Sequence, residues 1–257
     1  MMEVAVTAKG NVPDSEKDHA RERVSALDHC VSDPVLGARV TLRFERNRRL
    51  TRPARAEAEL NVNGHMLRGH VAGETMSKAI EQLGSHLERQ LHGFADRRDR
   101  LERRASVSQP GEWHHGAASP PRPDFRPRPV KDRAIVRRKS FVLGVTDPLG
   151  AIRDLLDLDH EFYLFHDAET DTDAVVYHRD DGRIGLIYPD ATRPPRAGEG
   201  PVYELSRLSE PITLETAIAQ MDAISHRFIF FINAESARGS IIYLRYDGNY
   251  GLIEPAD

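Results

Sequence analysis

The first 104 residues contain four stretches in which apolar and polar side chains alternate, which is the period of a β-strand with one buried face. An Asn63-Gly64 pair separates the third stretch from the fourth and is a strong signal for a tight hairpin. The apolar positions of the stretches are Val4, Val6 and Ala8; Val40, Leu42 and Phe44; Ala56, Ala58, Leu60 and Val62; and Leu67, Gly69 and Val71. The pattern predicts four strands, the last two joined by a hairpin.

Two further stretches carry apolar residues every three or four positions, the spacing of one helix face. The first begins after Pro13 and runs to about Cys30. The second is longer, and its apolar stripe consists of Met76, Ile80, Leu83, Leu87, Leu91 and Phe94. Residues 1–104 are therefore predicted to form a β-α-β-β-β-α domain whose sheet has one polar face and one face covered by helices.

Residues 105–132 have no apolar period and are rich in Pro, Gly and Ser, with Arg interspersed. This composition is typical of an extended or disordered linker. We therefore expect the segment to act as a flexible connection between residues 1–104 and the rest of the chain.

Beyond this segment the chain repeats itself at a constant offset of 66 residues. Fifteen positions within residues 151–189 are identical to those 66 residues later, too many at one register for chance. The two copies occupy residues 133–190 and 201–257, and each reads as a leading strand (135–143 and 202–208), a short helix and three strands. Modules this short bury little surface alone, so each is expected to need a partner. Candidate contact residues between the repeats are Phe162, Phe165, Phe228, Phe230 and Phe231.

The distribution of charge separates the front of the chain from its rear. The net charge of the 257 residues is -4, but residues 1–104 hold 19 basic and 16 acidic side chains, and residues 105–140 hold 8 and 3. Residues 141–257 hold only 9 basic against 21 acidic side chains. A basic front half favours a polyanionic partner such as RNA, since Lys and Arg release counterions from phosphates, and the acidic rear should avoid that partner.

Several function classes find no support in the sequence. It has no phosphate-binding glycine loop, nucleophile elbow, paired His and Cys, or spaced metal ligands, so we expect neither an enzyme nor a cofactor nor a metal site. A single cysteine, Cys30, fits a reducing compartment. The chain has no apolar run of spanning length and no signal-like amino terminus, so we expect a cytoplasmic protein with no membrane partner.

The residues also carry a resemblance to a known family. The NVNG hairpin and the helix AIEQLGSHLERQLHGFADRRDRLERR resemble the ribosome-binding domain of the hibernation-promoting factors. The endings RDDGRIGLIYP and RYDGNYGLIEP of the two repeats resemble the carboxy-terminal domain of the long form of that family. A doubled carboxy-terminal domain resembles the actinobacterial dormancy type. The fold class implied is α+β: the β-α-β-β-β-α domain, the linker, and two tandem small α/β repeats.

The resemblance implies a plug for the ribosome and no catalysis. The front domain would occupy the decoding region of the 30S subunit on 16S rRNA, block mRNA and tRNA binding, and hold 70S ribosomes inactive during stress or dormancy. Arg23 stands where the family has a basic residue on its first helix, and Arg89 lies within the matching LERQL. The family's Asp-Met-Tyr opening of the second helix is here Glu74-Thr75-Met76-Ser77, so a tyrosine contact is not expected. No DNA partner is implied.

The doubled rear portion departs from the family's long members, whose single terminal domain joins two chains and so two ribosomes into a 100S particle. Two tethered copies face each other at high effective concentration, so pairing within the chain should exceed pairing between chains. We therefore predict an intramolecular pseudo-dimer and 70S particles. Two alternatives stay open: 100S formation through pairing between chains, and a regulatory module that binds another protein through the acidic repeats.

The candidate RNA-binding residues are basic side chains on the two helices and on the loop after the second strand. They are Lys17, Arg21, Arg23, Arg46, Arg48, Arg49, Lys78, Arg89, Arg97, Arg98, Arg100, Arg103 and Arg104. The five at the end of the second helix could instead merely favour the helix dipole. Those on the first helix could lie along its apolar stripe with only their charged ends in water. Arg43 and Arg55 are equally compatible with an ordinary strand face, where Glu45 and Glu57 can neutralise them.

Overall fold

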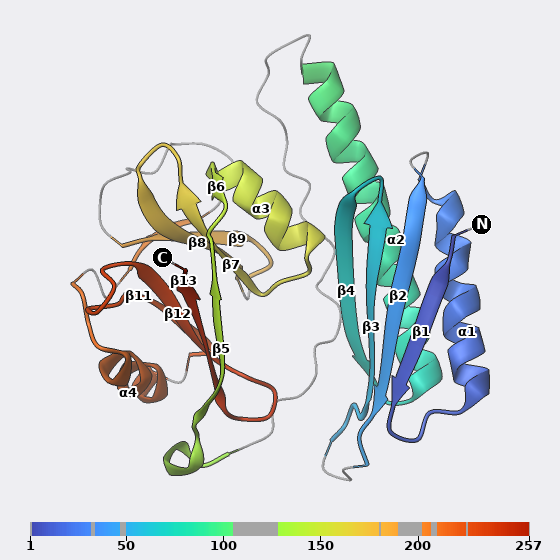
Figure 1. Ribbon diagram of the computed structural model, residues 1–257, viewed down its shortest axis with the longest axis horizontal. Helices are drawn as coiled ribbons and strands as arrows, with labels where there is room; N and C mark the ends of the chain where they lie inside the picture. The colour runs from blue at the N-terminus through green and yellow to red at the C-terminus, as the bar shows by residue number, and fades with distance from the viewer. Residues whose placement is uncertain are drawn as a thin grey trace. The chain divides into compact units, whose positions relative to one another are not determined.

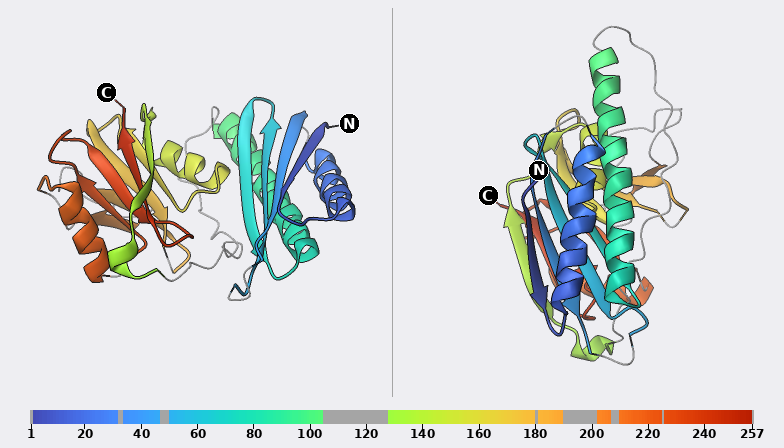
Figure 2. Two further views of the ribbon diagram at one scale, coloured as in Figure 1. Left: turned by 60° about the horizontal axis from the view of Figure 1, so that its bottom comes forward. Right: turned by 90° about the vertical axis from the view of Figure 1, so that its right-hand side faces the viewer.

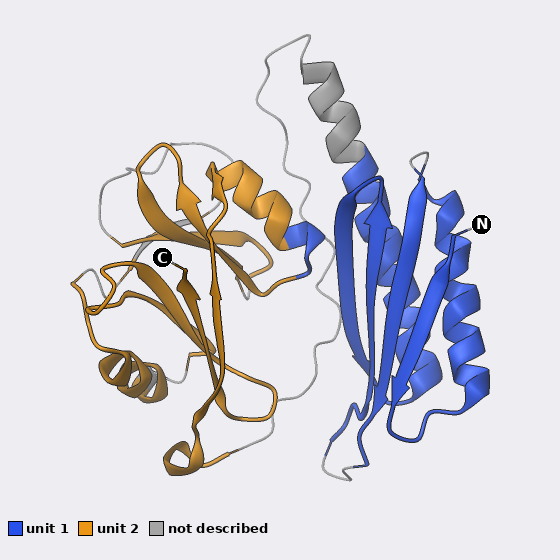
Figure 3. Ribbon diagram, viewed as in Figure 1, with its two compact units in different colours: residues 1–112, 117–124, 156–159 blue, residues 113–116, 125–155, 160–257 orange. Residues whose placement is uncertain are grey.

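The computed structural model describes residues 2–31, 34–46, 50–104, 128–179, 181–189, 202–206, 210–224 and 226–256, with side chains 96–104, 203, 205 and 224 left out. Figure 3 shows its two compact units, one with the elements from β1 to α2 and one with the strands from β5 to β13. Most of the predicted linker lies outside the described residues. None of the helices in the described ranges is long and apolar enough to cross a bilayer.

The first unit is the predicted β-α-β-β-β-α arrangement. Its strands are β1 (Val4–Lys9), β2 (Val35–Phe44), β3 (Ala54–Val62) and β4 (His65–Gly73), and its helices are α1 (Asp14–Ser25) and α2 (Met76–Arg104). The sheet order is β1-β2-β3-β4, with β1 parallel to β2 and the other pairs antiparallel. Figures 1 and 2 show both helices on the same face of this sheet. The other face is left free of helices, as the alternation predicted.

The core of the first unit lies between the sheet and the two helices. All six residues of the predicted α2 stripe are buried, from Met76 to Phe94. They pack against the inward side chains of β2 and β3, such as Leu42 and Leu60, which are fully buried. The hairpin between β3 and β4 turns at Asn63 and Gly64, both with positive φ, as this dipeptide favours. The apolar period therefore fixed which face of each element turns inward.

The second unit consists of two copies of one small fold. The first copy contains α3 (Pro148–Asp157), β7 (Phe162–Asp167), β8 (Thr172–His178) and β9 (Ile184–Tyr188). The second contains α4 (Leu214–Ile224), β11 (Phe228–Ile232), β12 (Gly239–Leu244) and β13 (Tyr250–Pro255). The 66-residue offset extends to the backbone, because the equivalent residues Asp171 and Ala237 both have a φ of 54°. The structure thus confirms the duplicated α/β repeat.

The leading strands exchange places between the two repeats. β5 (Ile135–Phe141) precedes the first repeat but pairs in parallel with β13 of the second. β10 (Val202–Leu205) precedes the second repeat but pairs in parallel with β9 of the first. The resulting sheets are β10-β9-β8-β7-β6, where β6 is the short strand Val145–Thr146, and β11-β12-β13-β5. Each sheet is therefore completed by a strand that comes from the other half of the unit.

An equivalent glycine supports a tyrosine ring in each repeat. A Cβ atom on Gly185 would lie 2.1 Å from the Tyr177 ring, and one on Gly251 would lie 2.3 Å from the Tyr243 ring. These distances are far below van der Waals contact, so only glycine lets the two rings lie flat across the neighbouring strand. The Gly-Leu-Ile identity seen in the sequence thus has a packing cause in both copies.

Candidate nucleic-acid interface

Three basic residues lie together at one end of the helix-free face of the first sheet. Lys9 and Arg43 are directly paired across β1 and β2, and Arg46 follows two residues after β2 ends. All three are exposed, and none has an ion-pair partner within the described ranges. A hydrogen bond of 3.2 Å between the hydroxyls of Thr7 and Thr41 marks the same face one row away. We call Lys9, Arg43 and Arg46 the basic edge.

The other arginines of this face are neutralised by neighbouring carboxylates. Arg55 pairs with Glu45 at 3.4 Å, and its side chain is only 15% exposed. Glu59 lies between Arg39 at 3.9 Å and Arg68 at 3.1 Å. The face is therefore basic at one end and mixed in charge along the rest, and this contrast separates Arg43 from Arg55, which the sequence could not.

Three of the predicted helix cations are held by acidic residues on the same chain segment. Lys17 lies 2.7 Å from Asp14, Arg21 lies 2.6 Å from Asp18, and Lys78 lies 2.6 Å from Glu74. The hydrogen bonds from Lys17 and Lys78 lower the pKa of Asp14 and of Glu74. Exposed pairs of this kind contribute about 0–1 kcal/mol, so a phosphate can replace the carboxylate at small cost.

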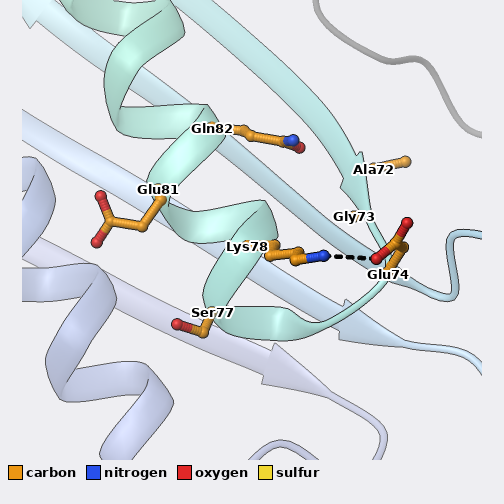
Figure 4. A pocket seen from close by; sticks show the side chains of 7 residues that line it. All are labelled: Ala72, Gly73, Glu74, Ser77, Lys78, Glu81 and Gln82. Carbon is orange, nitrogen blue, oxygen red and sulfur yellow. Dashed lines mark hydrogen bonds and ion pairs between the residues drawn. The ribbon is translucent and has the colours of Figure 1, made fainter.

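Lys78 also lines a hollow at the start of α2, which Figure 4 shows from close by. The hollow is formed by Ala72, Gly73, Glu74, Ser77, Lys78, Glu81 and Gln82. Two carboxylates against one ammonium give it a net negative charge. The hollow therefore does not by itself favour a phosphate, and Lys78 is a weaker candidate than the basic edge.

Arg23 connects the two helices of the first unit. Its guanidinium lies 3.3 Å from Glu81 and 3.4 Å from Glu88, both on α2, and its side chain is 22% exposed. It crosses directly over Gly84, where a Cβ atom would lie 2.6 Å from Nε of Arg23. Arg23 is thus placed as a link between α1 and α2, which differs from the expectation of a phosphate contact.

The remaining predicted cations lie on or near the same two regions. Arg89 is exposed on α2, and no partner is recorded for it within the described ranges. Arg97, Arg98, Arg100, Arg103 and Arg104 belong to the last turns of α2, where the side chains are outside the described residues. Arg48 and Arg49 also lie outside the described residues. Their roles stay predictions from the sequence.

An aromatic cluster joins the two repeats of the second unit. The rings of Phe162 and Phe228 are 5.0 Å apart, and each also contacts a tyrosine of the opposite repeat, Tyr243 at 5.4 Å and Tyr177 at 5.3 Å. Beside them a buried cluster contains Leu143, Leu164, Val175, Phe230 and Ile241, drawn from both halves of the unit. Three of the five predicted contact residues thus lie between the repeats.

Phe165 and Phe231 lie elsewhere, although both are fully buried. Phe231 belongs to the cluster that contains Ala217 and Met221 of α4, so it faces the helix of its own repeat. Successive side chains of a strand point to opposite faces, and Phe230 already faces the other repeat. The equivalent residue Phe165 follows Leu164 in the same way. The sequence showed a strand buried on both faces but not which residue belonged to which face.

Comparison with known families decides the identity of both units. The family described as "Sigma 54 modulation protein / S30EA ribosomal protein" matches residues 4–99. The description "Sigma 54 modulation/S30EA ribosomal protein C terminus" matches twice, at residues 131–186 and 205–252. This chain belongs to the S30EA family. The two matches to the carboxy-terminal domain agree with the observed repeat.

Relatives of this S30EA protein include a "Ribosome hibernation promotion factor" of Deinococcus radiodurans, 34% identical over 68% of this chain and 92% of the relative. A "Dormancy associated translation inhibitor" of Mycobacterium tuberculosis is 37% identical over 53% of each chain, so the match spans about half the length of that relative. The solved N-terminal domain of Thermus thermophilus Protein Y is 20% identical, with a TM-score of 0.30, over 36% of this chain and 97% of that one.

Two features of the S30EA protein were missed from its sequence. The ligand atoms of Cys30, Glu88 and His92 lie within 4.8 Å of one another, although they come from distant segments. Glu88 already accepts from Arg23, and burial raises the pKa of the Cys30 thiol, so both groups would have to give up these states to bind a cation. The second feature, a charged contact between the repeats, also has no local sequence signal, because its partners are 65 residues apart.

Proposed function

We propose that this chain is a ribosome hibernation factor that binds the decoding region of the small subunit on 16S rRNA, blocks mRNA and tRNA, and keeps 70S ribosomes inactive. The observation that carries the proposal is the basic edge, a set of exposed and unpaired cations on the open face of an S30EA domain. Arg89 and the arginines at the end of α2 extend the basic surface. The proposed role is non-catalytic and cytoplasmic.

The shape of the basic surface supports recognition of the RNA backbone. Its cations come from a sheet edge and an adjoining loop, and most other charges on the domain are internally paired. Duplex RNA hides its base edges in a deep and narrow groove, so phosphates and shape are what such a surface can read. The acidic second unit should stay clear of the phosphates.

We further propose that the two repeats act as an intramolecular pseudo-dimer. The exchanged strands β5 and β10 and the aromatic cluster support this, because each repeat supplies what completes the other. A pair formed within one chain uses up the surface that would join two chains. The expected product is therefore the 70S particle and no 100S particle.

Salt dependence tests the proposed RNA contact. If about 6 to 10 phosphates are engaged, the association constant for purified 30S subunits should fall by about three to five decades between 50 mM and 200 mM salt. The measurement is a binding titration of the labelled full chain at a series of salt concentrations. Affinity that is independent of salt would contradict a phosphate-led contact and would favour a protein-binding module that acts through the acidic repeats.

A further inference from the structure

The contacts between the repeats follow an approximate two-fold axis. Adding 66 to a residue of the first repeat gives its equivalent in the second, so a contact between a residue and its own equivalent lies on the axis. Phe162 and Phe228 form one such contact. The flanking contacts are exchanged by the same operation, since Phe162–Tyr243 at 5.4 Å corresponds to Tyr177–Phe228 at 5.3 Å. The aromatic part of the interface is thus symmetric.

A second contact on the axis breaks this symmetry. Asp173 in β8 meets its own equivalent, Gly239 in β12, whose backbone N–H donates to Oδ2 of Asp173 at 2.8 Å. Arg238 donates to the same carboxylate from Nε at 2.8 Å and from its terminal nitrogen at 3.0 Å. The residue equivalent to Arg238 in the first repeat is Thr172, which has no charge. The anion therefore belongs to one repeat, and the cation and the glycine belong to the other.

The carboxylate at this position is well satisfied. The side chain of Asp173 is 4% exposed, and His166 of the same repeat lies 2.9 Å from its other oxygen. Burial acts to raise the pKa of Asp173, but the hydrogen bonds from Arg238, His166 and Gly239 lower it overall. Hydrogen bonds to an ionised buried group are among the strong ones, and a buried carboxylate without them would be costly.

Pairing of two identical repeats would lose these contacts. Two first repeats would place Asp173 against a second Asp173, and a Cβ atom at position 239 lies only 2.6 Å from Cβ of Asp173. Two like charges would then be buried on the axis with threonine in place of arginine. Two second repeats would place glycine against glycine and leave both copies of Arg238 without the carboxylate. Only the mixed pair satisfies both sides.

We propose that Asp173, Arg238 and Gly239 form a lock that restricts the interface to a first repeat paired with a second repeat. The lock rests on the proposed pseudo-dimer and adds the partner rule: the surface fits the other half of its own chain and rejects the same half of a second copy. Because the two halves are tethered, this rule directs the chain to close on itself.

The test uses variants of the full chain. Gly239→Asp recreates the junction of two first repeats within an otherwise intact molecule, and we expect the melting temperature of the second unit to fall by at least about 5 °C. The matched control is Gly144→Asp, which adds the same charge at an exposed glycine. A melting temperature equal to that of the control would overturn the lock.

A mirrored variant separates specific recognition from simple damage. Changing Thr172→Arg, Asp173→Gly, Arg238→Thr and Gly239→Asp together moves the lock to the equivalent positions. We expect this variant to recover at least half of the melting temperature lost by Gly239→Asp; no recovery would overturn the proposal. Ribosome binding is measured on the same samples. Its absence in the unaltered chain would refute the proposed function and leave the melting result to decide the lock.

Discussion

Replacing Lys9, Arg43 and Arg46 with glutamate is expected to lower the affinity for 30S subunits about a thousandfold at 0.1 M salt. The three cations are exposed and unpaired, so each is free to contact a phosphate. One phosphate contact is worth nearly tenfold at this salt concentration, because the counterion it releases enters a dilute solution. The slope of log affinity against log salt should also fall by about 3. A filter-binding or sedimentation titration of the full-length variant measures both quantities.

The matched control for this variant changes the net charge equally but in the second unit. Lys131, Arg137 and Lys139 are exposed there and can be replaced by glutamate without touching a buried group. We expect this control to bind 30S subunits within about threefold of the unaltered chain, since long-range repulsion is screened over roughly 10 Å. Equal losses for both triple variants would show that net charge alone governs binding and would contradict a contact at the basic edge.

Removing the ring of Phe230 should destabilise both repeats together. Phe230 is 4% exposed and lies in the cluster that takes Leu143, Leu164 and Val175 from the other half of the unit. Truncating a buried phenylalanine to alanine costs about 3–5 kcal/mol of unfolding free energy, through lost burial and the cavity left behind. Chemical denaturation of the full-length Phe230→Ala variant gives the loss. Hydrogen exchange then reports which amides lose protection, and we expect them in β7 and β8 as well as in β11 and β12.

The control is Phe141→Ala, since this ring is 39% exposed on β5 and its removal leaves no cavity. We expect that control to cost less than about 1 kcal/mol. Loss of protection confined to the second repeat in Phe230→Ala would mean that the repeats unfold independently. That result would contradict a shared core and with it the pseudo-dimer.

The order of elements and the duplication could both be predicted from the sequence. Apolar periods of two and of three to four residues identify strands and helices locally, and a repeat of identities such as Asp181-Gly182 and Asp247-Gly248 needs no structure to be seen. The exchange of β5 and β10 could not be predicted, because each strand has the same local pattern whichever sheet it joins. Strand partners are decided by tertiary packing, which a single sequence does not display.

The candidate site was predictable in type but not in membership. Basic residues near the end of β2 were identified, yet Lys9 was missed, because its neighbour Arg43 belongs to a strand 34 residues away. Arg23 was taken for a phosphate contact, but its partners Glu81 and Glu88 lie 58 and 65 residues further along the chain. Whether a cation is free or paired depends on such distant contacts. Charge counts show that a surface is basic, and only the fold shows which residues make it so.

Sucrose-gradient sedimentation of 70S ribosomes mixed with the full chain tests the central claim most directly. The account predicts that the protein moves with the 70S peak at low salt and that no 100S peak forms at any protein concentration. Protein left at the top of the gradient would contradict the ribosome contact, and a 100S peak that grows with added protein would contradict closure of the repeats within one chain.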